Sequence, residues 1–263
     1  MWRIISVLEG RNMRSKWVLV IAVVGLFSMC ASARAAIKTE TVTYKSGNET
    51  VSGYLALPGT PGKHPALIVI HEWWGLVPWV KEQTDKFAAE GYVALAVDLY
   101  RGQTTENPKE AAHLMSTMPP QRALRDLKAA FTYLSSRPDV EPGKIGDVGW
   151  CFGGGWALRL ATVEPKLAAC AINYGELTTD ASALGAIRCP VLGNFGALDP
   201  NITPAKVGAF EAAMRKAGKS INVKIYPGAT HAFENPNNKT GYRPRDAANA
   251  WARMTAFFSR TLK

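Results

Sequence analysis

The feature that most constrains the fold is the pentapeptide Gly-Trp-Cys-Phe-Gly at 149–153, which directly follows a short strand-like run at 145–148. Glycines two residues before and after a central residue are typical of a tight turn from a β-strand into an α-helix, because they let the two elements approach closely. Cys151 then lies at the exposed apex of the turn, where the positive end of the helix favours its thiolate. The alternative interpretation is a buried cysteine in an ordinary strand–helix turn.

The rest of the chain alternates between short apolar runs and longer helical segments. Wholly apolar runs are typical of buried parallel strands, so the alternation predicts an α/β fold with a mainly parallel central sheet and helices on both faces. The first two strands are expected to pair antiparallel, with Gly53 as a candidate bulge position. The expected strands are 37–44, 51–57, 66–70, 93–97, 145–148, 167–172, 191–195 and 221–225, and the expected helices are 77–90, 109–115, 120–136, a helix after Cys151, 204–217 and 245–262.

Two polar residues in loops after late strands could complete a catalytic set with Cys151. His231 lies in a loop that follows the apolar run at 221–226, where a general base would be placed. Asp199 follows the apolar run at 191–195 and precedes a proline that stiffens the turn, which favours it as the acid. Asp180 and Glu176, after the preceding strand, are the alternative acids. The resulting chain order is nucleophile, acid, base.

Five segments together resemble the dienelactone hydrolase family: Val-Ile-His-Glu-Trp-Trp-Gly at 69–75, Ala-Val-Asp-Leu-Tyr at 96–100, the Cys151 turn, Gly-Asn-Phe-Gly-Ala-Leu-Asp-Pro at 193–200 and Tyr-Pro-Gly-Ala-Thr-His-Ala-Phe at 226–233. They run in family order, and the resemblance extends from about residue 38 to residue 262. It implies an α/β-hydrolase fold and a triad of Cys151, His231 and Asp199. It also implies a glutamate near the thiol, which falls on Glu72.

Each implied residue has a chemical role in cleaving a small ester or lactone through an acyl-thioester. His231 takes the thiol proton and returns it to the leaving oxygen, while Asp199 fixes the imidazole tautomer. The backbone N–H groups of Phe152 and Trp73 are expected to bind the oxyanion. Glu72 would raise the pKa of the thiol or accept its proton, and in the family it is thought to let substrate binding trigger thiolate formation. The alternative is that Glu72 is an exposed acid at a strand end.

The chain departs from the family where the substrate carboxylate is bound. Members that act on dienelactone hold its carboxylate with two arginines, one shortly after the Asp-Leu-Tyr segment and one four residues after the histidine. Arg101 is displaced by one position from the first, and Asn235 stands at the second. The usual bidentate clamp is therefore not expected. Arg101, Tyr100 and Trp74 remain candidate substrate-binding residues; Trp74 and Trp73 are equally compatible with packing.

The N-terminal 35 residues have the composition of a secretory signal peptide. A basic stretch at 11–16 precedes an apolar stretch at 17–29, and Ala-Arg-Ala at 33–35 has the form of a cleavage site. We therefore expect residues 36–263 to form a single exported domain, periplasmic or secreted; an uncleaved anchor is the alternative. Met13 is a more typical signal start than Met1. With 47% hydrophobic and 20% charged residues, the chain suits a globular domain with a sizeable core.

Composition also bounds the partners. The net charge of +10 is spread along the chain, so we expect no nucleic-acid partner and, after signal cleavage, no stable membrane association. No metal or other cofactor is expected, and the protein should be a monomer or a small homo-oligomer. Cys170 and Cys189 either form a disulfide or are two buried thiols. Other classes are a non-catalytic binding protein of the same fold and a thiol redox sensor, although the sequence offers no C-x-x-C pair.

Overall fold

The strands form an 8-stranded sheet in the computed structural model, which describes residues 36–263. The strand order is β1-β2-β4-β3-β5-β6-β7-β8, and from β4 to β8 all neighbours are parallel. The expected fold class is thereby confirmed, while the predicted signal peptide lies outside the described residues. The strand bounds are β1 Lys38–Ser46, β2 Glu49–Leu57, β3 His64–Ile70, β4 Val93–Val97, β5 Val140–Trp150, β6 Ala169–Asn173, β7 Val191–Gly196 and β8 Ile221–Tyr226.

The antiparallel edge of the sheet consists of β1 and β2, as predicted, and β2 also pairs antiparallel with β4. Gly53 is not a bulge, because it pairs in continuous register with Val42 on one side and Val97 on the other. A Cβ at this position would lie 2.8 Å from the carbonyl oxygen of Ala96. Glycine is therefore required there by the close approach of β4.

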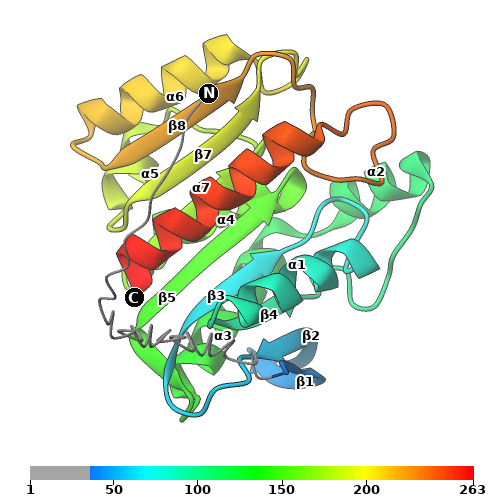
Figure 1. Ribbon diagram of the computed structural model, residues 1–263, viewed down its shortest axis with the longest axis vertical. Coiled ribbons are helices and arrows are strands. Elements are labelled where there is room, and N and C mark those ends of the chain that lie inside the picture. Colours follow the sequence, from blue (N-terminus) through cyan, green and yellow to red (C-terminus); the bar gives the residue numbers. More distant parts are fainter. Residues whose placement is uncertain (1–35) are drawn as a thin grey trace, which may run out of the picture. The chain divides into compact units, whose positions relative to one another are not determined.

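Helices cover both faces of the sheet (Figure 1). The helices α1 (Pro78–Ala89) and α7 (Pro244–Leu262) pack on one face, and α3 (Pro120–Ser136), α4 (Phe152–Val163) and α6 (Pro204–Lys216) pack on the other. Two short helices, α2 (Pro108–Thr117) and α5 (Ala181–Ala186), lie in connections; the sequence did not predict α5. The Asp180 carboxylate accepts a hydrogen bond from the backbone N–H of Ala183, so this alternative acid caps α5.

The core is built by the central strands, whose runs at 66–70 and 93–97 are completely buried. Apolar side chains on both sheet faces form two clusters, one under α1 and α7 and the other under α3, α4 and α6. Because the central strands are parallel, their carboxyl ends meet at one edge, and the loops that follow them converge there. This edge carries the residues described next.

Candidate active site

Cys151 stands at the turn between β5 and α4, as the glycine pattern predicted. Its backbone has φ 54°, an unfavourable value for a residue other than glycine, and its N–H donates to the carbonyl oxygen of Asn173 at 2.9 Å. A Cβ at Gly149 would lie 2.1 Å from the carbonyl oxygen of Gly153, and one at Gly153 would lie 2.2 Å from that of Ile70. The two glycines therefore allow the strained turn that presents the partly exposed thiol.

His231 and Asp199 meet beside this turn. His231 lies in the loop after β8, and its Nδ1 is 2.6 Å from Oδ2 of Asp199, which lies in the loop after β7. The other carboxylate oxygen of Asp199 accepts hydrogen bonds from the backbone N–H groups of Asn201 and Ile202. Asp199 is thus held from two sides, and the structure brings together the three residues expected to form the triad.

The electrostatics of this pair suit a proton carrier. Burial alone would lower the pKa of His231, but hydrogen bonds to Asp199 and to Cys151, with the charges of both groups, raise this pKa to about 10. Burial alone would raise the pKa of Asp199, but the bond from His231 and the backbone N–H groups lower it overall. An ionised Asp199 therefore stabilises a protonated His231.

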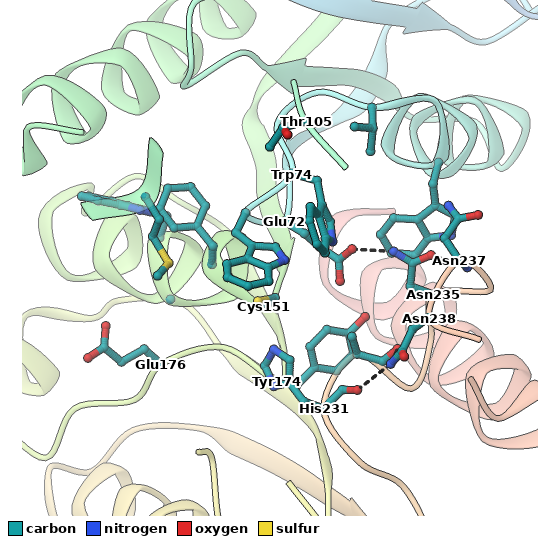
Figure 2. Close-up of a pocket in the computed structure, with 18 of the residues that line it drawn as sticks. Glu72, Trp74, Thr105, Cys151, Tyr174, Glu176, His231, Asn235, Asn237 and Asn238 are labelled. Atoms are coloured by element: carbon teal, nitrogen blue, oxygen red, sulfur yellow. Dashed lines mark hydrogen bonds between the residues drawn. The ribbon is translucent and has the colours of Figure 1, made fainter. Parts of the chain in front are cut away.

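Glu72 is buried at the end of β3, not exposed, and its side chain is turned toward Asn235 (Figure 2). The Asn235 side-chain amide donates to Oε2 of Glu72 at 2.5 Å. The second oxygen, Oε1, has no hydrogen-bond partner within residues 36–263, and neither has the buried hydroxyl of Tyr174. Burial raises the pKa of Glu72 to about 7, although the bond from Asn235 and the charge of His231 act in the opposite direction. Glu72 can therefore gain or lose a proton near neutral pH.

A second buried carboxyl group, Glu234, lies close enough to Glu72 for their charges to interact. Trp150 Nε1 donates to its Oε2 at 3.0 Å. Burial raises the pKa of Glu234 to about 8, and the charge of Glu72 adds to the effect, while the hydrogen bond from Trp150 opposes it. Sequence reasoning missed this residue and Tyr174, because neither belongs to a motif. Glu234 lies three residues after His231, and Tyr174 directly follows β6; these positions near the site are the only features of the sequence that could have indicated them.

His71 and Tyr100 contact the residues that surround the site. His71 Nδ1 is 2.5 Å from the carbonyl oxygen of Glu72, and the Leu99 N–H donates to Nε2 at 3.3 Å. A neutral imidazole that donates from Nδ1 satisfies both contacts, in keeping with burial, which lowers the pKa of His71. Tyr100 packs edge-on against this ring and also contacts Phe152. Tyr100 is absent from the cavity lining, so its contacts are with the protein.

A cavity of about 1460 Å³ opens above Cys151 (Figure 2). Glu72, Tyr174 and His231 line it together with the thiol. Trp73 and Trp74 also line it and pack edge to face, with ring centroids 4.8 Å apart. Phe152, another lining residue, opens α4, where backbone N–H groups have no partner within the helix. The two expected oxyanion-binding residues thus flank the thiol, at the end of β3 and the start of α4.

Arg101 does not reach this cavity. Its guanidinium pairs with the buried Asp126 on α3 at 2.8 Å and with Glu49 at 3.2 Å. The expected role in substrate binding is therefore not supported by its position. Cys170 and Cys189 are both buried free thiols. The disulfide is thus not formed, and the alternative of two thiols is the one observed.

Residues 36–263 contain neither a metal-binding cluster nor a membrane-spanning helix. No group of three or more His, Cys, Asp or Glu side chains in this range is arranged to hold a metal ion. None of the helices there combines the length and the apolar character needed to cross a bilayer.

Comparison with known proteins agrees with the geometry. A sequence model of the dienelactone hydrolase family matches residues 51–262. A protein of Aquifex aeolicus named "Putative carboxymethylenebutenolidase" is 32% identical over 85% of this chain and 99% of its own length, and "Protein usf" of Aquifex pyrophilus is 33% identical with the same coverage. A solved dienelactone hydrolase-like promiscuous phosphotriesterase from metagenomic libraries superimposes with a TM-score of 0.80 at 26% identity, over 87% of this chain and all of that one. The chain is a hydrolase and belongs to the dienelactone hydrolase family.

Proposed function

We propose that the protein hydrolyses a small ester or lactone with Cys151 as nucleophile, His231 as general base and acid, and Asp199 as the residue that orients His231. The observation that carries this proposal is the 2.6 Å contact between His231 and Asp199 beside a cysteine held at φ 54° on a helix N-terminus. A strained turn of this kind exposes a nucleophile to a carbonyl carbon.

The reaction runs in two displacements. The Cys151 sulfur attacks the carbonyl carbon as the thiolate, after its proton has passed to His231, whose pKa is raised to about 10, and the new S–C bond leaves a tetrahedral oxyanion. The C–O bond to the alcohol then breaks, and His231 returns the proton to the leaving oxygen. Water, deprotonated by His231, attacks the thioester carbon next. The C–S bond breaks, the acid leaves, and Cys151 recovers its proton.

Two further features support this chemistry. Phe152 and Trp73 line the same cavity as the thiol, and their N–H groups would donate to the oxyanion; loss of one such donor typically costs about 3 kcal/mol of barrier lowering. Glu72 lines the same cavity with a pKa of about 7, so it can gain or lose a proton beside the site near neutral pH. Trp74 would contact the substrate from the wall of the cavity.

The direct test is hydrolysis of dienelactone and of 4-nitrophenyl acetate by purified protein and by Cys151→Ala. We expect turnover by the parent, none above background by the variant, and an acyl adduct on the peptide that contains Cys151 after rapid acid quench and mass spectrometry. The matched control is Cys189→Ala, which removes a thiol outside the cavity and should keep the activity. Equal activity of Cys151→Ala and the parent would refute the nucleophile assignment and favour a binding role.

We also propose that the enzyme is exported after removal of residues 1–35, on the strength of the basic, apolar and Ala-Arg-Ala pattern in that segment. N-terminal sequencing of protein recovered from a bacterial host would check this proposal. We expect the first residue to be Ala36. A mature protein that starts at Met1 or Met13 would contradict it.

A further inference from the structure

The charged residues of the cavity are mostly acidic. The lining carboxylates are Glu72, Glu82, Glu106 and Glu176, and the lining arginine and lysine are Arg159 and Lys239. The protonated His231 also lines the cavity, but its charge is already paired with the carboxylate of Asp199. Glu72 is the one beside the nucleophile and is 1% exposed. Asn235, 4% exposed, contacts Glu72 with a neutral amide, so the side chain bonded to this carboxylate carries no positive charge.

Neither Arg159 nor Lys239 is placed to receive a carboxylate near the thiol. The Arg159 guanidinium stacks over the Trp156 ring at 4.8 Å and pairs with Glu176 at 3.5 Å. Lys239 is an exposed side chain on the loop that follows His231. Arg101 pairs with Asp126 and Glu49 instead, outside the cavity. A substrate carboxylate held next to Cys151 would thus meet Glu72 and find neither an arginine nor a lysine there, while the charge of His231 is already balanced by Asp199.

Such a carboxylate would be unfavourable on two grounds. Removing it from water costs free energy unless an opposite charge or several donors replace the solvent. Near neutral pH Glu72 is partly ionised, so it would also repel a second anion in the same cavity.

The apolar part of the cavity wall is rich in aromatic side chains. It includes Trp73, Trp74, Phe152, Trp156, Met118 and Ile202. Flat indole faces of this kind bind apolar groups through buried area and dispersion.

We propose that this site selects esters and lactones that carry no carboxylate and that place an apolar group against the tryptophans, and that it discriminates against carboxylate-bearing substrates such as dienelactone. The proposal rests on the ester hydrolysis proposed above and names its substrate class. Asn235 is the residue that sets this preference, because it holds Glu72 with a neutral group where a cation would attract an anion.

The test compares two rigid esters that differ mainly in charge: 4-nitrophenyl 4-(methoxycarbonyl)benzoate and the corresponding free 4-carboxybenzoate. Both release 4-nitrophenol, and each kcat/KM is divided by the rate constant of hydroxide hydrolysis to remove intrinsic reactivity. We expect the normalised kcat/KM at pH 7.5 to be about tenfold or more higher for the uncharged ester. An equal or higher value for the carboxylate would overturn the proposal.

Two variants locate the origin of the preference. Asn235→Arg should lower the ratio of uncharged to anionic ester by placing a cation beside Glu72, and Lys239→Ala should leave the ratio as in the parent. An unchanged ratio in a folded Asn235→Arg would refute the assignment to Asn235, and a rise in the ratio in Lys239→Ala would assign part of the preference to Lys239 instead. Thermal unfolding monitors folding of each variant, and the ratio in the parent decides the substrate class even if Asn235→Arg does not fold. If neither ester is cleaved faster by the parent than by Cys151→Ala, the proposed ester hydrolysis itself fails.

Discussion

At the scale of single residues, the bond between Asp199 and His231 controls which nitrogen of the imidazole faces the thiol. Asp199→Asn replaces an acceptor by a group that can also donate, so the productive tautomer is no longer enforced. We expect kcat to fall by roughly 10²- to 10⁴-fold with little change in stability. Steady-state kinetics on an aryl ester measures the effect. Asp180→Asn is the matched control, because asparagine caps a helix as well as aspartate; full activity is expected. Equal kinetics of the two variants would contradict the role of Asp199.

Unlike Asp199, Arg101 forms ion pairs only outside the cavity, so we expect it to affect stability and not catalysis. Its removal leaves the buried Asp126 carboxylate with only Ser46 and the more distant Arg125 as partners. We expect Arg101→Ala to lower the free energy of unfolding by about 1–3 kcal/mol while kcat/KM of the uncharged ester stays unchanged. Urea denaturation and initial rates provide the two measurements. A loss of kcat/KM without a loss of stability would return Arg101 to the substrate site.

The same residues show what a sequence can predict at this scale. Cys151, His231 and Asp199 belong to segments with local patterns, so the sequence alone indicated that they would meet. The contact of Glu72 with Asn235 joins positions 163 residues apart and carries no local pattern. The ion pair of Arg101 could not be predicted for the same reason, because its partner Asp126 lies on α3, outside the Asp-Leu-Tyr segment that suggested a role in substrate binding.

At the scale of elements, the close packing of α4 against β3 requires glycine in the first turn of the helix. A Cβ at Gly153 would lie 2.2 Å from the carbonyl oxygen of Ile70, whereas one at Gly208 in α6 would meet nothing within 4 Å. We expect Gly153→Ala to destabilise the fold by about 1–3 kcal/mol or more and to impair catalysis, since α4 carries the N–H of Phe152. Gly208→Ala should stabilise it by about 0.5–1 kcal/mol. Equal stability of both variants, measured by urea denaturation, would contradict this account.

Element prediction succeeded where the sequence has a clear apolar pattern and failed where it has none. The wholly apolar runs at 66–70 and 93–97 are strands as expected, because only a buried parallel strand accommodates side chains of that kind on both faces. The six-residue helix α5 was missed, since its small residues show no apolar periodicity. Gly53 was misinterpreted because sequence cannot distinguish a bulge from a close approach of the next strand.

At the scale of the whole molecule, buried ionisable groups determine how stability changes with pH. Burial raises the pKa of Glu72 to about 7 and of Glu234 to about 8, and His231 is raised to about 10. Each group keeps a proton in the folded state that the unfolded chain has already lost, so stability falls as pH rises toward these values. His71 acts in the opposite direction because burial lowers its pKa, but its contribution is about half complete at pH 6.5 and is outweighed by the three groups whose pKa is raised. From pH 6.5 to 8 the net trend is therefore downward.

Glu234 allows this trend to be tested away from the thiol, because Gln can accept the same hydrogen bond from Trp150 without titrating. A proton held only by the folded state contributes a slope of about 1.4 kcal/mol per pH unit to the free energy of unfolding. We expect urea denaturation at pH 6.5, 7.25 and 8 to show a falling free energy of unfolding for the parent and a flatter line for Glu234→Gln. Glu40→Gln, an exposed substitution on β1, should reproduce the slope of the parent. If Glu234→Gln has the slope of the parent, Glu234 titrates alike in the folded and unfolded states and the buried proton is not there.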